Sequence, residues 1–414
     1  MPPGGKIPGL DIARTVAIVL AMLNHSFIAT NVWRDFFEGK PHVTFAVRLA
    51  TPMFIILFGA LLEIVYRRRA VRDGMQAVTA RLFERGLLCW LLYTLTLLPL
   101  LLLGKTSVKS ALFGALLLGK IPLTDILRYY AILFFMAPLL LVVRQRWGLY
   151  PLLATTTSSC WRTPFVLLPA PDPEFAHYAP ARMADLILGI GDAVTGPSVL
   201  HSLFFVALGM LIGRILNEER SGEIVARRAA TGRFVVLAAA LGFGACHGTD
   251  GAGEGDGTER CGDGAQECEP SLLLFAGACG ATSIIALCRL VRHDGIWTQR
   301  ATIPGRRSLF AFSAGNAFLI CVTWDYGFDI PGRLALSGVF FLTVIVLTAL
   351  YDILMRPTAR ASSNRLVRVA SRCWAAIADP VNQRLRTAAL GLTALLWHAP
   401  VLSKRAEASG GQCL

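Results

Sequence analysis

Four polar residues interrupt an apolar stretch near the N-terminus, GLDIARTVAIVLAMLNHSFIATNVW, which covers residues 9–33. They are Asp11, Arg14, Asn24 and His25. Ionisable groups at membrane depth are costly, and they usually face the interior of a helical bundle or a water-filled cavity. A histidine in hydrocarbon is also a natural proton acceptor near neutral pH. The stretch therefore predicts proton-transfer chemistry within an apolar helix.

Helical spacing would bring three of these residues to one face. His25 follows Arg14 by eleven residues, which at about 100° each leaves the two within about 20° and about 16 Å apart along the axis. Asp11 lies about 40° off the same line, one turn before Arg14, and can pair with it. Taken singly, Asp11 and Arg14 could mark a helix end, and His25 could bond to a neighbouring helix. Their alignment favours a site.

The elements that must position this face follow from composition. Of the 414 residues, 54% are hydrophobic and 16% are charged, and the mean hydropathy is +0.56. This composition excludes a set of soluble domains. Most apolar stretches approach the ~20 residues that cross ~30 Å of hydrocarbon, where backbone groups must be satisfied within their own segment. The sequence predicts an all-α polytopic bundle, with residues 1–414 as one membrane domain.

About ten spans are expected. Their predicted ranges are 10–31, 44–66, 86–103, 124–143, 148–168, 198–216, 234–247, 271–290, 308–325 and 334–354. Residues 108–119 are apolar but too short to span, and favour a re-entrant or surface segment. Residues 387–402 are either an eleventh span or an interfacial helix, with their length favouring the interface.

Basic residues alternate between the loops, with about 25 in one set and about nine in the other. The positive-inside rule then places the N-terminus in the cytoplasm and residues 355–414 in a basic cytoplasmic segment.

The same rule accounts for the net charge of +13. No basic run is interleaved with stacking aromatics in a soluble segment, so nucleic acid is not an expected partner. The first apolar stretch is expected to remain as a signal anchor.

The two long loops predicted outside the cytoplasm are residues 169–197 and 248–270. The second is rich in glycine and acidic residues, in a spacing that does not match a calcium loop. Cys261 and Cys268 lie in it and could form a disulfide if the loop faces an oxidising compartment. The sequence has no CxxC and no His/Cys cluster at metal-ligand spacing, so no metal site is expected.

Several segments together resemble a known family. An aspartate followed by arginine, ten residues and histidine in the first span is similar to the signature of acyltransferase family 3 and of the related glucan-succinylating membrane acyltransferases. Further similar segments are TPMFIILFGALLE (51–63), ARLFERG (80–86), DILRYYAILFFMAPLLLV (125–142) and GRRSLFAFSAGNAFL (305–319). In the last of these, Asn316 stands near a position where the family often has a histidine.

The resemblance implies a membrane-bound O-acyltransferase. His25 would be the base that activates an acceptor hydroxyl, or a relay for the acyl group, and Arg14 would hold the donor. That donor would be a cytoplasmic acyl-CoA, and the acceptor a carbohydrate or glycoconjugate at the outer face of the plasma (inner) membrane. No bound cofactor is expected.

Four further ionisable residues are candidates for substrate binding. Arg81 and Arg85 could contact the phosphates of the donor, although positive-inside placement alone also explains them. Arg48 and Glu63, about four turns apart on the second predicted span, could line the cavity.

One departure from the family pattern concerns packing. Thr15 replaces the glycine that usually follows the arginine, which puts a close helix approach there in doubt.

The alternative function is a multi-span transporter that uses Asp11, Arg14 and His25 as a proton or substrate relay. Such a carrier should show two matching halves with broken helices, and no convincing repeat is apparent in the sequence.

Overall fold

The computed structural model describes residues 8–37, 40–119, 123–166, 179–188, 198–219, 224–247, 270–291, 295–322, 327–356 and 364–398. Within these ranges every regular element is a helix, which confirms the all-α prediction. The chain divides into two compact units, residues 1–64 with 149–348, and residues 65–148 with 349–414. The predicted loop cysteines, Cys261 and Cys268, lie outside the described residues.

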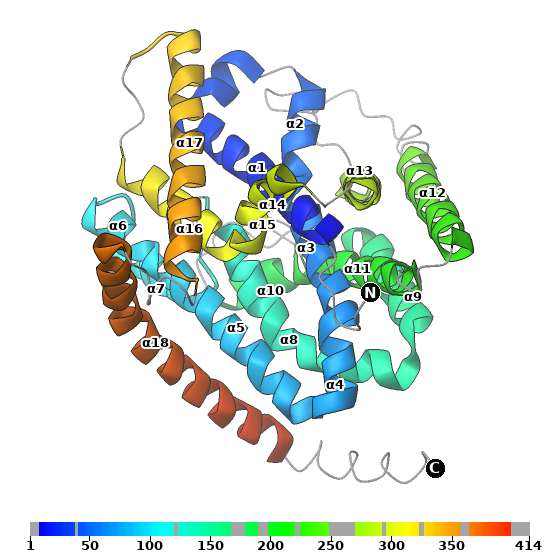
Figure 1. Ribbon diagram of the computed structural model, residues 1–414. Coiled ribbons are helices and arrows are strands. Elements are labelled where there is room, and N and C mark those ends of the chain that lie inside the picture. The colour runs from blue at the N-terminus through cyan, green and yellow to red at the C-terminus, as the bar shows by residue number, and fades with distance from the viewer. Residues whose placement is uncertain are drawn as a thin grey trace. The chain divides into compact units, whose positions relative to one another are not determined.

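The first unit is built around α1, Pro8–Ala29 (Figure 1). It also contains α2 Pro41–Arg48, α3 Ala50–Leu61, α9 Leu149–Val166, α10 Ala179–Leu188, α11 Val199–Glu219, α12 Ile224–His247, α13 Pro270–Leu290, α14 Ile296–Ala301, α15 Ile303–Arg306, α16 Ser308–Cys321 and most of α17 Ile330–Leu354. α1 packs against α3, α13, α15 and α16, while α3 packs against α11 and α12 against α13. The helix that carries the predicted site is thus surrounded by four neighbours.

Glycines set the distance between α3 and α11. A Cβ on Gly59 would stand 2.1 Å from the Val206 carbonyl oxygen, and one on Gly209 would stand 2.1 Å from that of Ile56. Gly213, one turn further along α11, faces the Ala60 carbonyl in the same way. Gly209 and Gly213 form a small-xxx-small motif, which lets helix backbones approach closely in a membrane. The α3–α11 pair is therefore a tight backbone contact.

This contact gives a stability prediction. Gly209→Ala should force the two backbones apart and cost about 1–3 kcal/mol, the usual range for overpacking. The matched control is Gly338→Ala on α17, where an added Cβ meets nothing within 4 Å and should gain up to about 1 kcal/mol in helix propensity. The measurement is the thermal unfolding midpoint in detergent. Equal midpoints for the two variants would contradict the assignment.

The second unit contains α4 Arg67–Asp73, α5 Met75–Leu95, α6 Leu97–Leu102, α7 Val108–Ala115, α8 Asp125–Trp147 and α18 Arg365–His398. α5 packs against both α8 and α18. Gly86 on α5 faces Phe134 of α8, whose Cβ would lie 3.2 Å from an added Cβ. Arg128 on α8 is fully buried and donates to the Gly119 carbonyl at 2.5 Å, so it ties α8 to the segment that precedes it.

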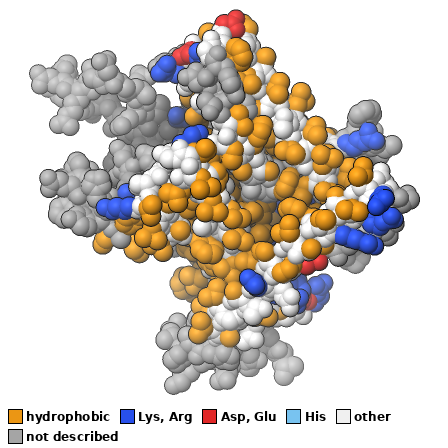
Figure 2. All heavy atoms as spheres, turned by 90° about the vertical axis from the view of Figure 1, so that its left-hand side faces the viewer, with side chains coloured by type: hydrophobic (Ala, Val, Ile, Leu, Met, Phe, Trp, Pro, Cys, Tyr) orange, Lys and Arg blue, Asp and Glu red, His pale blue; other side chains and the backbone are white. Residues whose placement is uncertain are grey.

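Among the described residues, six helical segments are long and apolar enough to cross a membrane, judged by length and composition. They are Gly9–Ala29, Phe45–Asp73, Met75–Leu102, Ile126–Trp147, Val199–Glu219 and Ile330–Leu354. Phe275–Leu290 and Ser308–Cys321 are shorter apolar helices. Figure 2 shows one face on which hydrophobic side chains predominate, with most Lys and Arg side chains near its margins. The predicted total of about ten spans and the cytoplasmic N-terminus stay predictions.

One predicted boundary was wrong. The helix of the third span begins at Met75 rather than near residue 86, because a helix continues past its apolar part into the basic segment. Residues 387–398 are the end of the 34-residue α18, which is not among the six spanning segments, and their predicted place as an interfacial helix or an eleventh span stays a prediction. Arg48 and Glu63 both lie in the candidate span Phe45–Asp73, as predicted, with Arg48 at the end of α2 and Glu63 in the π-helical turn Leu62–Tyr66.

Candidate active site

His25 of α1 is hydrogen-bonded to Asn316 of α16, with 2.8 Å between Nδ1 and Oδ1. An amide oxygen only accepts, so the ring nitrogen that faces it carries the hydrogen. The tautomer that follows from this amide orientation leaves Nε2 with a lone pair. Asn316 is fully buried. The pair therefore presents a histidine whose second nitrogen can accept a proton.

Aromatic rings and a glycine shape the surroundings of this pair. The Phe312 ring stands edge-on to the His25 ring at 5.5 Å between centroids, and Phe54 of α3 stands edge-on to Phe312 at 6.2 Å. A Cβ on Gly315 would lie 2.6 Å from the Met22 sulfur. The absence of a side chain at Gly315 thus leaves room for the Met22 side chain of α1 one residue before Asn316.

At the other end of α1, Arg14 Nη1 lies 3.6 Å from Asp11 Oδ1, which confirms that the two residues pair. The Arg14 side chain is 20% exposed, but its Nη2 atom is buried and has no hydrogen-bond partner among the described residues. A buried donor without a partner is costly, and a bound anion would relieve that cost. Arg14 is therefore placed to hold an anionic group.

The close helix approach that Thr15 put in doubt does occur, because the neighbouring helix supplies the glycine. A Cβ on Gly305 of α15 would stand 2.1 Å from the Asp11 carbonyl oxygen. The Gly305 amide donates to Thr15 Oγ1 at 3.0 Å, and that hydroxyl donates to the Asp11 carbonyl. At this close approach, Thr15 thus adds a hydrogen bond between α1 and α15.

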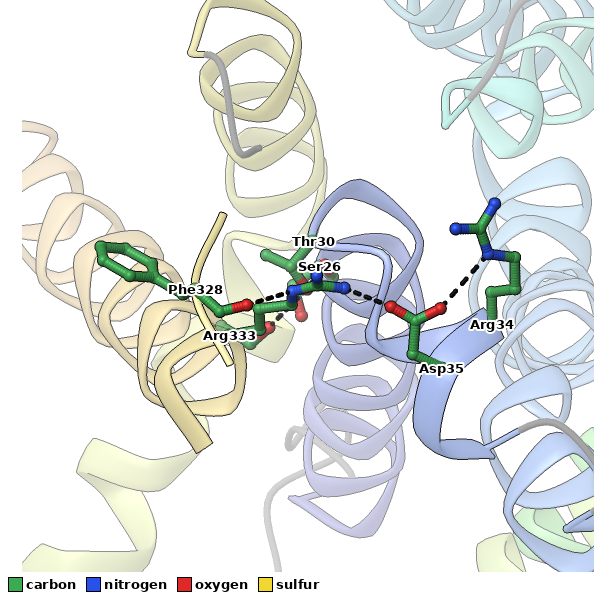
Figure 3. Close-up of polar contacts among 7 residues, drawn as sticks. Ser26, Thr30, Arg34, Asp35, Phe328 and Arg333 are labelled. Carbon is green, nitrogen blue, oxygen red and sulfur yellow. Dashed lines mark hydrogen bonds and ion pairs between the residues drawn. The ribbon is translucent and has the colours of Figure 1, made fainter. Parts of the chain in front are cut away.

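The end of α1 beyond His25 is tied to α17. Thr30 Oγ1 lies 3.1 Å from the hydroxyl of Ser337, and both side chains are buried. Figure 3 shows Arg333 between the Phe328 carbonyl, to which it donates at 2.8 Å, and Asp35, which also accepts from Arg34. These two arginines, Arg34 foremost, hold the pKa of the Asp35 carboxyl below its usual range. Residues of α15, α16 and α17 thus contact α1 and the residues that follow it at several levels.

The two residues predicted on the second span differ in their setting. Arg48 is exposed. Glu63 is fully buried, and Gly213 of α11 lies against it, since an added Cβ there would be 3.1 Å from the Glu63 Cβ. A buried carboxylate on a π-helical turn is typical of functional positions in membrane proteins. Burial therefore favours Glu63 over Arg48 as a residue that lines the predicted substrate cavity.

Arg81 and Arg85 belong to the second unit, where both are exposed on α5. Arg81 lies 3.6 Å from Asp73, measured from Nη1 to Oδ2. The structure thus brings Asp11, Arg14 and His25 onto one helix, and it describes the two α5 arginines in a separate unit. Their part in the site stays a prediction.

Sequence reasoning did not identify Asn316 as the partner of His25. The available signal was an amide in an otherwise apolar helix, since such a side chain usually bonds across to another helix in a membrane. The glycines at 305 and 315, which let the segment approach α1, were not noticed either.

Comparison with known proteins gives one family match. A family model described as an acyltransferase domain matches residues 7–352, from the start of α1 to the last turn of α17. The matched range contains every candidate residue described above, and α18 follows it. No curated protein matches the chain.

Proposed function

Because this chain belongs to acyltransferase family 3 and is a membrane acyltransferase, we propose that it moves an acyl group from a cytoplasmic acyl-CoA to a hydroxyl of a carbohydrate or glycoconjugate at the outer face. The observation that carries this proposal is the hydrogen bond between His25 and Asn316 in the matched region. It supports a base with a defined tautomer, which general base catalysis on a hydroxyl requires.

In the proposed reaction, His25 Nε2 takes the proton of the acceptor hydroxyl as its oxygen attacks the thioester carbon. A new carbon–oxygen ester bond forms and the carbon–sulfur bond breaks. The leaving thiolate of coenzyme A takes the proton back from the imidazolium, so the base is regenerated. The burial of Asn316 and the contact of the buried Phe312 ring with His25 support exclusion of water, which would otherwise compete as acceptor.

Arg14 is proposed to hold an anionic part of the donor through its buried Nη2 atom. Asp11 would fix the guanidinium from the other side. Arg81 and Arg85 are proposed contacts for donor phosphates, and Arg48 and Glu63 are proposed to line the substrate cavity. The cytoplasmic placement of the N-terminus, and with it of Arg14, belongs to the same proposal.

The test is acylation in a host that lacks this activity. Cells that express the wild-type chain should show hydroxyl compounds of the envelope with an added acyl mass, detected by mass spectrometry of glycans and lipids. Arg14→Ala should lower this product and raise the donor concentration needed for half-maximal rate. A transporter would instead change the distribution of a solute with no acylated product, and that result would refute the transferase.

A further inference from the structure

A cavity lies between α9, α11 and α12 of the first unit, with a volume of about 630 Å³. At one end it is lined by Arg214, Glu218 and Arg233. The rest of its lining from α11 and α12 is apolar or small, for example Leu211, Val236 and Leu237. This size is within the range of small-molecule sites. None of these residues takes part in the proposed acyl transfer.

The charged end has an excess of positive charge. Arg214 Nε donates to Glu218 Oε1 at 3.1 Å, and Arg233 donates to the other oxygen of the same carboxylate. The Arg214 guanidinium also lies over the Tyr150 ring, 5.5 Å from its centroid. Two guanidinium groups thus share one carboxylate, which leaves a net charge of about +1. Both arginine side chains remain about half exposed, so their other donors can bind an anion.

Polarity changes along the cavity. The charged residues lie at the C-terminal end of α11, a candidate span, and in the third turn of α12. From Arg233 to Ala240, a distance of about 10 Å along α12, the lining residues of this helix are Val236, Leu237 and Ala240. Val236 is 68% exposed, so the apolar part is open to its surroundings. A cation at one end and an open apolar wall beyond it match an anionic headgroup joined to an acyl chain.

We propose that this cavity binds an anionic phospholipid, with its phosphate at Arg214 and Arg233 and one chain along Val236 and Leu237. Basic pockets between spans on the cytoplasmic side are suited to acidic headgroups. These arginines lie toward the C-terminus of α11 and the N-terminus of α12, which the positive-inside rule predicts to face that side. Free phosphate would satisfy the arginines but leave the apolar wall open. A zwitterionic lipid would cover the wall without supplying net negative charge.

The experiment uses the full chain in neutral detergent, titrated with phosphatidylglycerol or with phosphatidylcholine of the same chains. Bound lipid is measured by native mass spectrometry, and stabilisation by the unfolding midpoint. Phosphatidylglycerol should bind more tightly than phosphatidylcholine and raise the midpoint. Arg233→Gln should weaken phosphatidylglycerol binding by about fivefold, the effect of one cation near an anionic headgroup. Arg228→Gln, an exposed α12 arginine outside the cavity, should leave it unchanged.

A second variant guards against a folding defect. Val236→Trp keeps both arginines and fills the apolar part, and it should also reduce phosphatidylglycerol binding. Equal binding of the two lipids, or equal losses in the Arg233 and Arg228 variants, would overturn the proposal. Stabilisation by inorganic phosphate alone would reduce the site to a simple anion site. Stabilisation by acetyl-CoA that Arg233→Gln removes would make it a donor site instead, and would also count against the proposal.

Discussion

Replacement of His25 by alanine is expected to lower the rate of acyl transfer by about 10²–10⁴-fold, the usual contribution of a general base. Without the imidazole, the acceptor hydroxyl has no side-chain base and would have to transfer its proton to water. Because the side chain is lost but α1 keeps its contacts through Gly305 and Ser337, the protein should still fold. The measurement is the rate of acylated product formation per purified protein, with the unfolding midpoint recorded for each variant.

The matched control is His201→Ala. His201 is also a histidine in a candidate span, but its Nδ1 bonds to Ser198 of the same turn, at 2.7 Å. Its loss should leave the rate within about twofold, since a hydroxyl partner three residues earlier in the same turn is typical of local capping. His25→Gln keeps an amide donor toward Asn316 without a comparable base and should be as inactive as alanine. Activity in His25→Gln near that of the wild type would remove histidine from the reaction.

Much of the fold follows from the hydrophobic pattern, because length and composition alone decide which segments can lie in hydrocarbon. The first span was predicted at residues 10–31 and the helix runs Pro8–Ala29. The pattern says less about where a helix ends, since backbone hydrogen bonding continues into polar sequence. That is why α5 begins before the apolar part of its span and why α18 begins at Arg365, well before residue 387.

The site could be predicted only along one helix. The spacing of Arg14 and His25 fixes their common face, because helical periodicity depends on nothing outside the helix. The partner of His25 stands 291 positions later in the chain, and periodicity does not specify which helices meet. Glycine spacing carries part of that information: Gly209 and Gly213 indicate a close contact, although not that its partner is α3.

The last prediction concerns Asn316 as a positioning residue. Asn316→Leu keeps the volume roughly but removes the acceptor for the His25 Nδ1–H group. A hydrogen bond of this kind contributes about 0.5–1.5 kcal/mol, and its loss also frees the ring to turn or to change tautomer. We therefore expect the turnover rate to fall by about two- to tenfold, while the donor concentration for half-maximal rate stays unchanged, since Arg14 is untouched.

Rescue by a conservative variant separates positioning from packing. Asn316→Asp restores an acceptor oxygen at the same place and should recover most of the turnover lost in Asn316→Leu. Ser313→Ala is the packing control, because Ser313 is a buried residue about one turn earlier whose hydroxyl donates to the Leu309 carbonyl of its own helix. It should change turnover by less than about twofold. If Asn316→Asp is as slow as Asn316→Leu while both fold normally, the amide does not act through the histidine tautomer. The turnover of these two variants thus tests whether the bond between α1 and α16 orients a base or merely joins two helices.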